Sequence, residues 1–470
     1  MGMPTITPRQ IIGLVFARFL SAESTKVTFI SVEQKGIIFH PITKGKTESR
    51  CQKLRLAAIN CKYLNIDHIL QSGVINRTMD LSENITCNPN NLLKAFNKAV
   101  SASPQKAETK AFALKELDEI FRAQTELHNR TWKIAPMNSF IISERGHIRK
   151  IKGNTPYDRM IIHSYIDNSL QPLLEKYLIY DNYSSRIDKG TRLARKRFAQ
   201  FMHQAFRQYG NNQFYVQLVD FSKFYDNIQH QKLYDQIMAK IPHESFHSYM
   251  LSTILDSFKV DVSHMTDAQY QNCLNEKYIA LDHIWDKQLG EKYMRKSLNI
   301  GNQASQSFSI FYPTPIDNYC KIVKGIKFYG RYMDDIFIIS DNKQFLHETV
   351  AEITKIASEL GLFINEKKTQ IYKADRNFKF LNRIYRMSDT GHLFEYLSQE
   401  TITRQRRKMK KFKLLLESGK KDYSSIQNQY RAWIQNNYKF MSKKQLESFS
   451  QLYNDLFLNG WMKQQFQMRR

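Results

Sequence analysis

Helical and extended patterns of apolar residues alternate along this 470-residue chain. Five segments have patterns typical of helices, at residues 91–128 with an interruption at 101–105, 170–180, 190–207, 231–241 and 401–417. Three apolar and β-branched runs predict strands, near Ile141, at 214–220 and at 326–339. We therefore expect helices and strands to be mixed over most of the chain.

The helix predicted at 401–417 has two different faces and ends at Ser418 and Gly419. Its apolar side chains lie roughly on one face: Ile402, Met409, Phe412 and Leu416. Its cations make the rest strongly basic: Arg404, Arg406, Arg407, Lys408, Lys410, Lys411 and Lys413. Such a surface can bind phosphates, although a solvated surface helix is the alternative.

Residues 329–339, YGRYMDDIFII, place two adjacent carboxylates between an aromatic and an aliphatic run. Strand formers on both sides predict a β-hairpin with Asp334 and Asp335 at its turn. Two carboxylates repel each other unless a cation lies between them, and Mg²⁺ prefers oxygen ligands. A solvated turn is the alternative for such a pair taken alone.

A second apolar run, at 214–219, ends in Asp220 and predicts a buried strand with a carboxylate at its end. If this strand lies beside the hairpin, Asp220 and Asp334 can bridge two Mg²⁺ ions roughly 3.5 to 4 Å apart. This spacing is used for nucleotidyl transfer. Asp335 would then be an outer or partial ligand, and Mn²⁺ is an alternative to Mg²⁺.

The composition favours a polyanionic partner. Lys and Arg number 70 against 44 Asp and Glu, for a formal net charge of +26, and aromatic residues make up 13% of the chain. Positive charge binds nucleic acid in a salt-sensitive way, and aromatic rings can stack on unpaired bases or simply fill the core. Five scattered cysteines without a CxxC pair indicate neither a zinc site nor disulfides, which suits a reducing cytoplasm.

The strand that ends in Asp220 and the YMDD hairpin, in this order, resemble the palm of a reverse transcriptase. Further segments resemble motifs of that family, at residues 145–151 (RGHIRKI), 158–163 (DRMIIH), 181–191 (DNYSSRIDKGT), 300–306 (IGNQASQ), 361–369 (GLFINEKKT) and 378–382 (FKFLN). The resemblance implies an α+β right-hand polymerase, with fingers, a palm built on a ferredoxin-like antiparallel sheet with helices, and a helical thumb.

The resemblance covers about residues 91–440 and divides the chain into domains. It implies an N-terminal extension of unknown role at 1–90, fingers with N-terminal helices at 91–210, a palm at 211–390 with an insertion at about 231–295, and a helical thumb and tail at 391–470. In the extension we expect an amphipathic surface helix at 11–17, a strand at 26–30 and a helix at 54–64. No apolar run approaches the ~20 residues of a membrane span, so we expect no membrane partner.

The resemblance also implies roles for individual residues. The expected catalytic residues are Asp220, Asp334, Asp335 and Lys368, where Lys368, or Lys367 as the alternative, protonates the leaving pyrophosphate. The expected metal site adds Phe221 to the three aspartates. The expected dNTP site contains Arg145, Arg149, Phe221, Tyr225, Gly301 and Gln303, with Lys150 or Lys152 as further cations. The expected nucleic-acid contacts are Phe380 and Leu381 of the primer grip, and Arg404, Arg407, Lys408 and Lys411 of the thumb.

Tyr225, five residues after Asp220, lies where the family has an aromatic ring against the sugar of the incoming nucleotide. Such a ring would clash with a 2′-hydroxyl and select dNTPs, whereas the alternative is a core tyrosine. RNA-synthesising relatives tend to have aspartate at this offset and glycine at the position of Met333. The resemblance therefore implies RNA-directed DNA synthesis, with dNTPs, an RNA template and a DNA primer or product.

The IGNxxSQ form, the DRxxxH segment and NLLKAF at Asn91 resemble the diversity-generating, abortive-infection and defence-associated bacterial enzymes. This branch implies a cytoplasmic, antiphage role in bacteria and a dedicated structured non-coding RNA. Three alternatives stay open: template-independent synthesis, protein-primed synthesis, and an RNA-binding scaffold without turnover. The sequence also leaves open whether the chain forms a homo-oligomer or binds an accessory protein.

Overall fold

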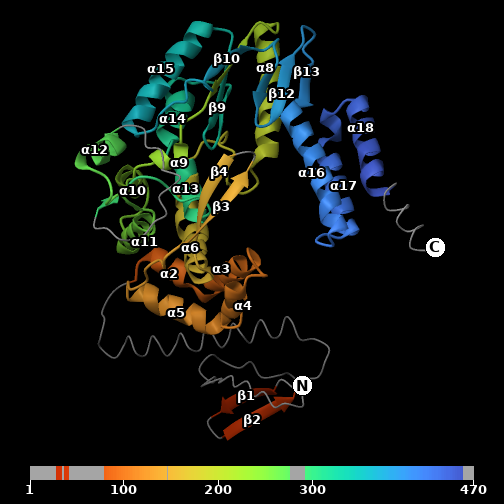
Figure 1. The fold of residues 1–470 in the computed structure, drawn as a ribbon. Coiled ribbons are helices and arrows are strands. Elements are labelled where there is room, and N and C mark those ends of the chain that lie inside the picture. The colour runs from red at the N-terminus through yellow and green to blue at the C-terminus, as the bar shows by residue number, and fades with distance from the viewer. Residues whose placement is uncertain (1–27, 34–35, 42–78, 145–146, 276–291, 459–470) are drawn as a thin grey trace, which may run out of the picture. The chain divides into compact units, whose positions relative to one another are not determined.

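The computed structural model describes residues 28–33, 36–41, 79–144, 147–275 and 292–458 (Figure 1). The chain divides into two compact units, each made of segments that are distant in sequence. Unit 1 consists of Met1–Lys176, Tyr234–Phe258 and Asn299–Ser305, and unit 2 of Tyr177–Leu233, Lys259–Leu298 and Gln306–Arg470. Among the described residues, no helix combines the length and apolar character needed to cross a membrane.

Unit 1 is mainly helical. Its helices are α2 (Leu81–Cys87), α3 (Pro89–Ser101), α4 (Ala107–Ala113), α5 (Glu116–His128), α6 (Pro156–Tyr165), α7 (Gln171–Leu174) and α11 (Ser245–Asp256). Helix α3 begins at a proline after Asn88, whose side chain accepts a hydrogen bond from Asn90 N, as is typical of a helix start. The interruption expected at 101–105 is confirmed within one residue, because α3 ends at Ser101 and α4 begins at Ala107.

The described part of unit 1 also contains two antiparallel hairpins. Strands β1 (Thr28–Glu33) and β2 (Gly36–Pro41) form one, and β3 (Asn138–Glu144) and β4 (His147–Gly153) the other. The strand expected near Ile141 is confirmed as β3, and β1 overlaps the strand expected at 26–30. The helices expected at 11–17 and 54–64 lie outside the described residues.

The helix expected at 170–180 is wrong in its bounds. The chain instead forms a π-helical turn, η3 (Ile166–Leu170), then α7 and a 3₁₀ turn, η4 (Glu175–Tyr177). Pro172, inside α7, has no backbone N–H to donate, which interrupts the regular ladder of helical hydrogen bonds.

The main sheet of unit 2 has four antiparallel strands. They are β5 (Tyr215–Val219), β8 (Tyr329–Tyr332), β9 (Asp335–Ser340) and β10 (Gln370–Lys373), in the spatial order β10-β5-β9-β8. Helix α8 (Thr191–Tyr209) packs on β8 and β9, and α15 (Lys343–Glu359) packs on β5 and β9. Because side chains alternate along a strand, Phe337 and Ile339 of β9 face the α8 side, while Ile336 and Ile338 face the other. The strands expected at 214–220 and 326–339 are confirmed.

Shorter elements lie between β5 and β8 in the sequence. They are α9 (Phe224–Asn227), α10 (His230–Met238), β6 (Val260–Asp261), α12 (Asp267–Asn275), β7 (Tyr293–Met294), α13 (Gln303–Phe311), α14 (Thr314–Asn318) and a π-helical turn, η5 (Tyr319–Val323). Helix α10 confirms the helical segment expected at 231–241. Helix α13 begins inside the IGNQASQ segment.

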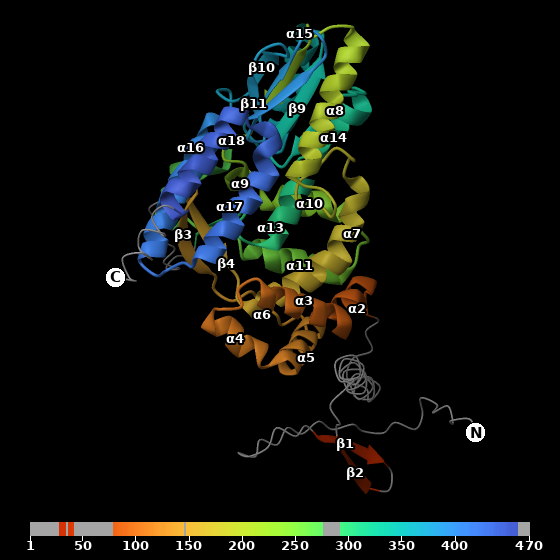
Figure 2. The same cartoon turned by 90° about the vertical axis from the view of Figure 1, so that its right-hand side faces the viewer.

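A second sheet and a helical region follow. The sheet contains β11 (Phe378–Phe380), β12 (Arg383–Met387) and β13 (Leu393–Leu397), in that order and antiparallel. The helices are α16 (Gln399–Glu417), α17 (Tyr423–Asn437) and α18 (Lys443–Tyr453), with the short turns η6 (Tyr438–Phe440) and η7 (Asn454–Leu458). Figures 1 and 2 show the three helices side by side. The expected two-faced helix is confirmed as α16, which buries Ile402, Met409 and Phe412, and Gly419 follows it with φ 67°.

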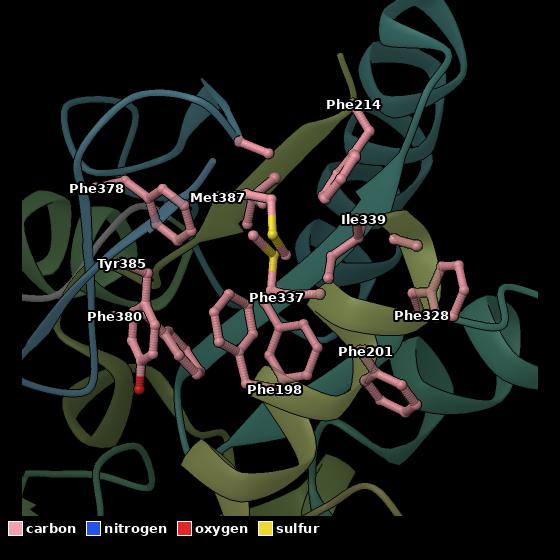
Figure 3. Packing of buried hydrophobic residues seen from close by; sticks show 14 of the residues in the cluster. Phe198, Phe201, Phe214, Phe328, Phe337, Ile339, Phe378, Phe380, Tyr385 and Met387 are labelled. Carbon is pink, nitrogen blue, oxygen red and sulfur yellow. The ribbon is translucent and has the colours of Figure 1, made fainter. Parts of the chain in front are cut away.

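The phenyl ring of Phe198 in α8 connects the four-stranded and the three-stranded sheet of unit 2 (Figure 3). Its ring centroid lies 5.0 Å from that of Phe337 in β9, and 4.9 Å from those of Phe380 in β11 and Tyr385 in β12. The contacts with Phe337 and Tyr385 are edge-to-face, an arrangement that aromatic quadrupoles favour. One fully buried side chain therefore fixes the second sheet against the first.

Replacing Phe198 by alanine should lower the free energy of unfolding by about 3–5 kcal/mol, since it removes this ring and leaves a cavity between the sheets. Urea unfolding followed by near-UV circular dichroism measures the change. Leu414→Ala, at a position 65% exposed on α16, is the control and should change stability by no more than about 0.5 kcal/mol. Equal effects of the two variants would contradict the role of Phe198.

Candidate active site

The strand register brings Asp220 and Asp335 together. Val219, the last residue of β5, pairs with Ile336 of β9, so Asp220 follows β5 at the level of Asp335. Tyr332 pairs with Asp335, which leaves Met333 and Asp334 as a two-residue turn between β8 and β9. The expectation that the strand ending in Asp220 lies beside the YMDD hairpin is therefore confirmed.

A fully buried ion pair holds this hairpin. The guanidinium of Arg331 in β8 donates to both carboxylate oxygens of Asp317, over 2.8 and 2.6 Å, and neither side chain is accessible to solvent. Tyr329 donates to the same carboxylate. Arg331 also donates to the carbonyls of Met333, at 2.9 Å, and Ile310, at 2.8 Å. The pair thus ties the backbone of the turn to α13 and α14.

Sequence reasoning missed this pair. The available signal was the arginine inside the strand predicted before the two aspartates, because a buried arginine requires a carboxylate partner. The sequence did not indicate that Asp317 is this partner. The turn itself is strained, since Met333 has φ 58°, a left-handed conformation that costs a residue other than glycine roughly 1–2 kcal/mol.

The segment after α15 encloses the carboxylate of Asp220. Asn365 Nδ2 donates to Asp220 Oδ1 at 3.0 Å, and the ammonium of Lys368 lies 3.1 Å from Oδ2. The backbone is paired as well, because Asn365 N donates to Asp220 O at 2.8 Å. Both Lys367 and Lys368 are exposed, and the structure places the ammonium of Lys368 at the Asp220 carboxylate. Asn365 was not anticipated from the sequence.

Electrostatic repulsion is concentrated on Asp335. Burial, and then the carboxylates of Asp334 and Asp220, raise its pKa from the usual range to about 7, while the nearby Lys368 ammonium opposes the rise. Within the described residues, no cluster of three or more His, Cys, Asp or Glu side chains is arranged to hold a metal ion by itself. Mg²⁺ sites of nucleotide enzymes generally need only one or two carboxylates, because substrate phosphates supply further oxygens. The donor set of paired aspartates therefore fits Mg²⁺.

Phe221 is buried and forms an isolated bridge with Ile364. Its side chain offers no metal ligand, so only its backbone carbonyl could serve in the expected metal site. Tyr225 is half-buried, and its hydroxyl lies 3.7 Å from the sulfur of Met333 and 3.3 Å from Ser309 Oγ. Ser309 Oγ is itself 3.1 Å from that sulfur. The tyrosine ring is thus placed at the hairpin turn by α13 and the turn itself.

The other residues expected in a dNTP site belong to unit 1. Arg145 lies outside the described residues, and Arg149 is exposed on β4. Gly301 lies against the same strand with φ 111°, where a Cβ atom would be 2.8 Å from the Ile151 side chain. Only glycine fits there without displacing β4. The amide of Gln303 binds His163 and Asp167 of the same unit.

The expected nucleic-acid contacts differ in accessibility. On α16, Arg404, Arg407, Lys408 and Lys411 are exposed, as expected for a surface that meets phosphates. Phe380, however, is only 4% exposed and packs on Phe198, so its side chain offers no surface to a primer. Leu381 is half-buried, and its carbonyl accepts two hydrogen bonds from Arg195. Any primer contact of Phe380 is therefore restricted to its backbone.

This fold, with aspartates at the ends of adjacent antiparallel strands and helices on both faces, is that of a nucleotidyltransferase. A family model described as "Reverse transcriptase (RNA-dependent DNA polymerase)" matches residues 144–384, a little more than half of the chain. The chain belongs to the reverse transcriptase family. The right-hand polymerase fold expected from the motifs is thereby confirmed.

Solved structures of telomerases also match the chain. Telomerase from Candida albicans in complex with the TWJ fragment of telomeric RNA has 12% identity and a TM-score of 0.38, and the match covers 58% of this chain and 46% of that chain. Apo telomerase from Candida tropicalis, truncated from its C-terminal domain, has 13% identity and a TM-score of 0.38, with 58% of each chain covered. The chain thus spans about half the length of these telomerase chains. No curated protein matches it.

Asp335→Asn should stabilise the metal-free protein increasingly as the pH rises. An aspartate in an unfolded chain loses its proton near pH 4, whereas Asp335 in the folded protein keeps its proton to about pH 7. Between these values the unfolded state binds fewer protons, so the stability of the wild type falls as pH increases. The gain in melting temperature from the substitution should be near zero below pH 4, grow to pH 7 and then level off.

Thermal unfolding across this pH range, with and without Mg²⁺, tests this prediction. Mg²⁺ should reduce the gain at pH 8, because a cation relieves the repulsion in the wild type. A gain that does not change with pH would contradict the assignment of the repulsion to Asp335.

Proposed function

We propose that the protein is an RNA-directed DNA polymerase that adds dNTPs to a 3′-hydroxyl by two-metal nucleotidyl transfer. The observation that supports this most is the register that places Asp220 beside Asp335, with Lys368 at the same carboxylates. Membership of the reverse transcriptase family supports the same reaction. We assign catalysis to Asp220, Asp334, Asp335 and Lys368.

Asp220, Asp334 and Asp335 would hold two Mg²⁺ ions, with Asp335 as the outer or partial ligand. When bound, the ions lower the pKa of the primer 3′-hydroxyl and neutralise charge on the triphosphate. Lys368, whose ammonium lies at Asp220, donates a proton to the leaving pyrophosphate. Asn365 orients the Asp220 carboxylate through Oδ1.

The substrate contacts follow from the same assignment. Arg149, with Arg145, Lys150 or Lys152, binds triphosphate oxygens, because developing negative charge requires fixed cations. Gly301 and Gln303 line the nucleotide site. The exposed cations of α16 bind phosphates of the template and primer, with an affinity that falls as salt rises.

We further propose that the RNA partner is a dedicated structured non-coding RNA and that the enzyme acts in antiphage defence in the bacterial cytoplasm. This part of the proposal is supported by the resemblance of the IGNxxSQ, DRxxxH and NLLKAF segments to defence-associated enzymes. A fold or family alone does not establish a biological role. The RNA is therefore the first component to identify.

Purification of the protein with its bound RNA, followed by addition of labelled dNTPs and Mg²⁺, tests the proposal. Sequencing of the product should give DNA complementary to the co-purified RNA. Homopolymeric product would indicate template-independent synthesis, and label that protease treatment releases would indicate protein priming. No incorporation under any of these conditions would contradict a polymerase and favour an RNA-binding scaffold.

Asp334→Asn should reduce DNA synthesis by about a thousandfold or more, equivalent to ~4 kcal/mol of transition-state stabilisation, because it removes a carboxylate charge from the metal site. Primer extension with the purified protein measures this loss. Asp341→Asn, at the opposite end of β9, is the matched control and should keep wild-type activity. Equal activities of the two variants would contradict the assignment.

Tyr225→Ala should reduce the preference for dNTPs over rNTPs by about tenfold or more, or ~1.4 kcal/mol, since it removes the ring that would clash with a 2′-hydroxyl. The ratio of kcat/KM for the two nucleotide types measures this preference. Tyr225→Phe keeps the ring and should keep the preference, although it loses the hydroxyl at Met333 and Ser309. Loss of selectivity in both variants would indicate that positioning by the hydroxyl, and not the bulk of the ring, sets selectivity.

A further inference from the structure

The second sheet of unit 2 has one buried face and one face open to solvent. Phe378, Phe380, Tyr385 and Met387 point into the core between the sheets. Because side chains alternate along each strand, the intervening residues point the other way. We call these residues the ring face: Lys379 of β11, Ile384 and Arg386 of β12, His392 before β13, and Phe394 and Tyr396 of β13.

Three aromatic rings form a row on the ring face. The Phe394 and Tyr396 rings are nearly parallel, at 12°, with centroids 5.9 Å apart, and the His392 ring meets Phe394 edge-on at 4.6 Å. The Arg386 guanidinium lies 4.7 Å from the centroid of the Phe394 ring, and Tyr396 is 40% exposed. Rings in a packed core would be covered, whereas this row is partly accessible to solvent.

The charge of the ring face is also one-sided. Its six residues include two fixed cations and a histidine but no carboxylate. Lys379 pairs with Glu400 at the start of α16, which leaves Arg386 as the cation that lies among the rings. An aromatic row with an arginine in it suits a ligand that has both flat rings and negative charge.

A cavity of about 540 Å³ opens beside Phe394, and its walls include the cation Arg386, His392, Asn212 and the two carboxylates Asp375 and Asp389. This volume lies within the range typical of small-ligand sites and accommodates a nucleobase. The cavity offers ring surface from Phe394 together with polar groups. Asp375 Oδ1 is buried without a hydrogen-bond partner among the described residues, as in a polar site that is incomplete without a ligand.

We propose that the ring face binds unpaired nucleobases of a single-stranded nucleic acid, with one base stacked on Phe394 beside Arg386 and the next on Tyr396. Sheets that present aromatic side chains to solvent bind single strands in this way, since every base has a flat surface and stacking tolerates any sequence. The formal net charge of +26 brings a polyanion to the surface. This site is separate from the aspartates, and its occupation does not depend on the proposed catalysis.

Packing within the sheet and contact between copies of the chain are the alternative roles of the rings. Cross-strand pairs such as Arg386 with Phe394, and Ile384 with Tyr396, can stabilise a sheet without binding anything. A second copy of the chain could also cover the face. If the rings only pack within the sheet or only contact a second copy, replacing them should not change the affinity for nucleic acid. The affinity of variants that lack the rings therefore distinguishes base stacking from these two roles.

The test uses the full chain and fluorescently labelled oligouridine and oligothymidine of about 12 nucleotides, within the usual site size of single-strand binders. Phe394→Leu and Tyr396→Leu keep apolar bulk in the sheet but remove the flat rings. Each should weaken binding about fivefold or more in fluorescence anisotropy, and Phe394→Trp should retain affinity. Tyr177→Leu, at a tyrosine of similar exposure (39%), is the matched control and should bind as the wild type does.

The salt dependence gives a second readout that a purely structural role would not change. Arg386→Gln should reduce the slope of log affinity against log salt by about one, because it removes one phosphate contact. The ring variants should keep the wild-type slope, since stacking releases no counterions. Primer extension on a saturating primed template should be unchanged in all of these variants, which distinguishes this site from the polymerase centre.

If the ring substitutions weaken RNA binding more than DNA binding, the result would support the proposal and identify a template or guide RNA as the ligand. If they weaken DNA binding more, the result would support the proposal and identify the DNA product as the ligand. Unchanged affinity of Phe394→Leu and Tyr396→Leu for both oligonucleotides would overturn it. A change of mass in light scattering without a change in affinity would likewise overturn it, in favour of contact between copies of the chain.

Discussion

The buried ion pair between Arg331 and Asp317 is the constraint on which the geometry of the aspartate hairpin depends. Removing two charges from water costs several kcal/mol for each ion, so the pair is tolerated only because its hydrogen-bonding groups are satisfied. Arg331 uses its remaining donors on the carbonyls of Met333 and Ile310. The turn that carries Asp334 is therefore attached to α13 and α14, and loss of either charge would leave the other buried and unpaired, at a cost of about 3–5 kcal/mol.

The site that this pair supports is destabilised by its own charges. Burial and the two neighbouring carboxylates disfavour the ionised form of Asp335, and Met333 holds a strained backbone conformation. Such local costs are characteristic of functional sites, where the surrounding structure compensates for them. Compensation here comes from the aromatic contacts of Phe198, which join α8 to the four-stranded and the three-stranded sheet of unit 2. The tight packing around Phe198 thereby offsets the repulsion between the aspartates, which stay close enough together to bind a cation.

One face of the second sheet is packed in the core, and its other face is exposed to solvent. Its inward residues complete the aromatic core, whereas its outward residues present the rings and cations of the ring face. Phe380 illustrates the consequence for sequence comparison. Its motif suggested a primer contact, but its position in β11 points the side chain to the core. In a strand, a shift of one residue exchanges the two faces, so a motif match alone does not decide which side chains are exposed.

Local patterns in the sequence were sufficient to predict the hairpin with Asp334 and Asp335, the strand that ends in Asp220 and the two-faced helix α16. Alternation, helical periodicity and turn composition depend on neighbouring residues, so one sequence reveals them. The partner of Arg331, the choice of Lys368 over Lys367 at Asp220, the orienting amide of Asn365 and the burial of Phe380 were decided only by the tertiary structure. These features arise where the chain brings distant residues together, and the energy of a charge or ring depends on what surrounds it after folding, which sequence spacing does not specify.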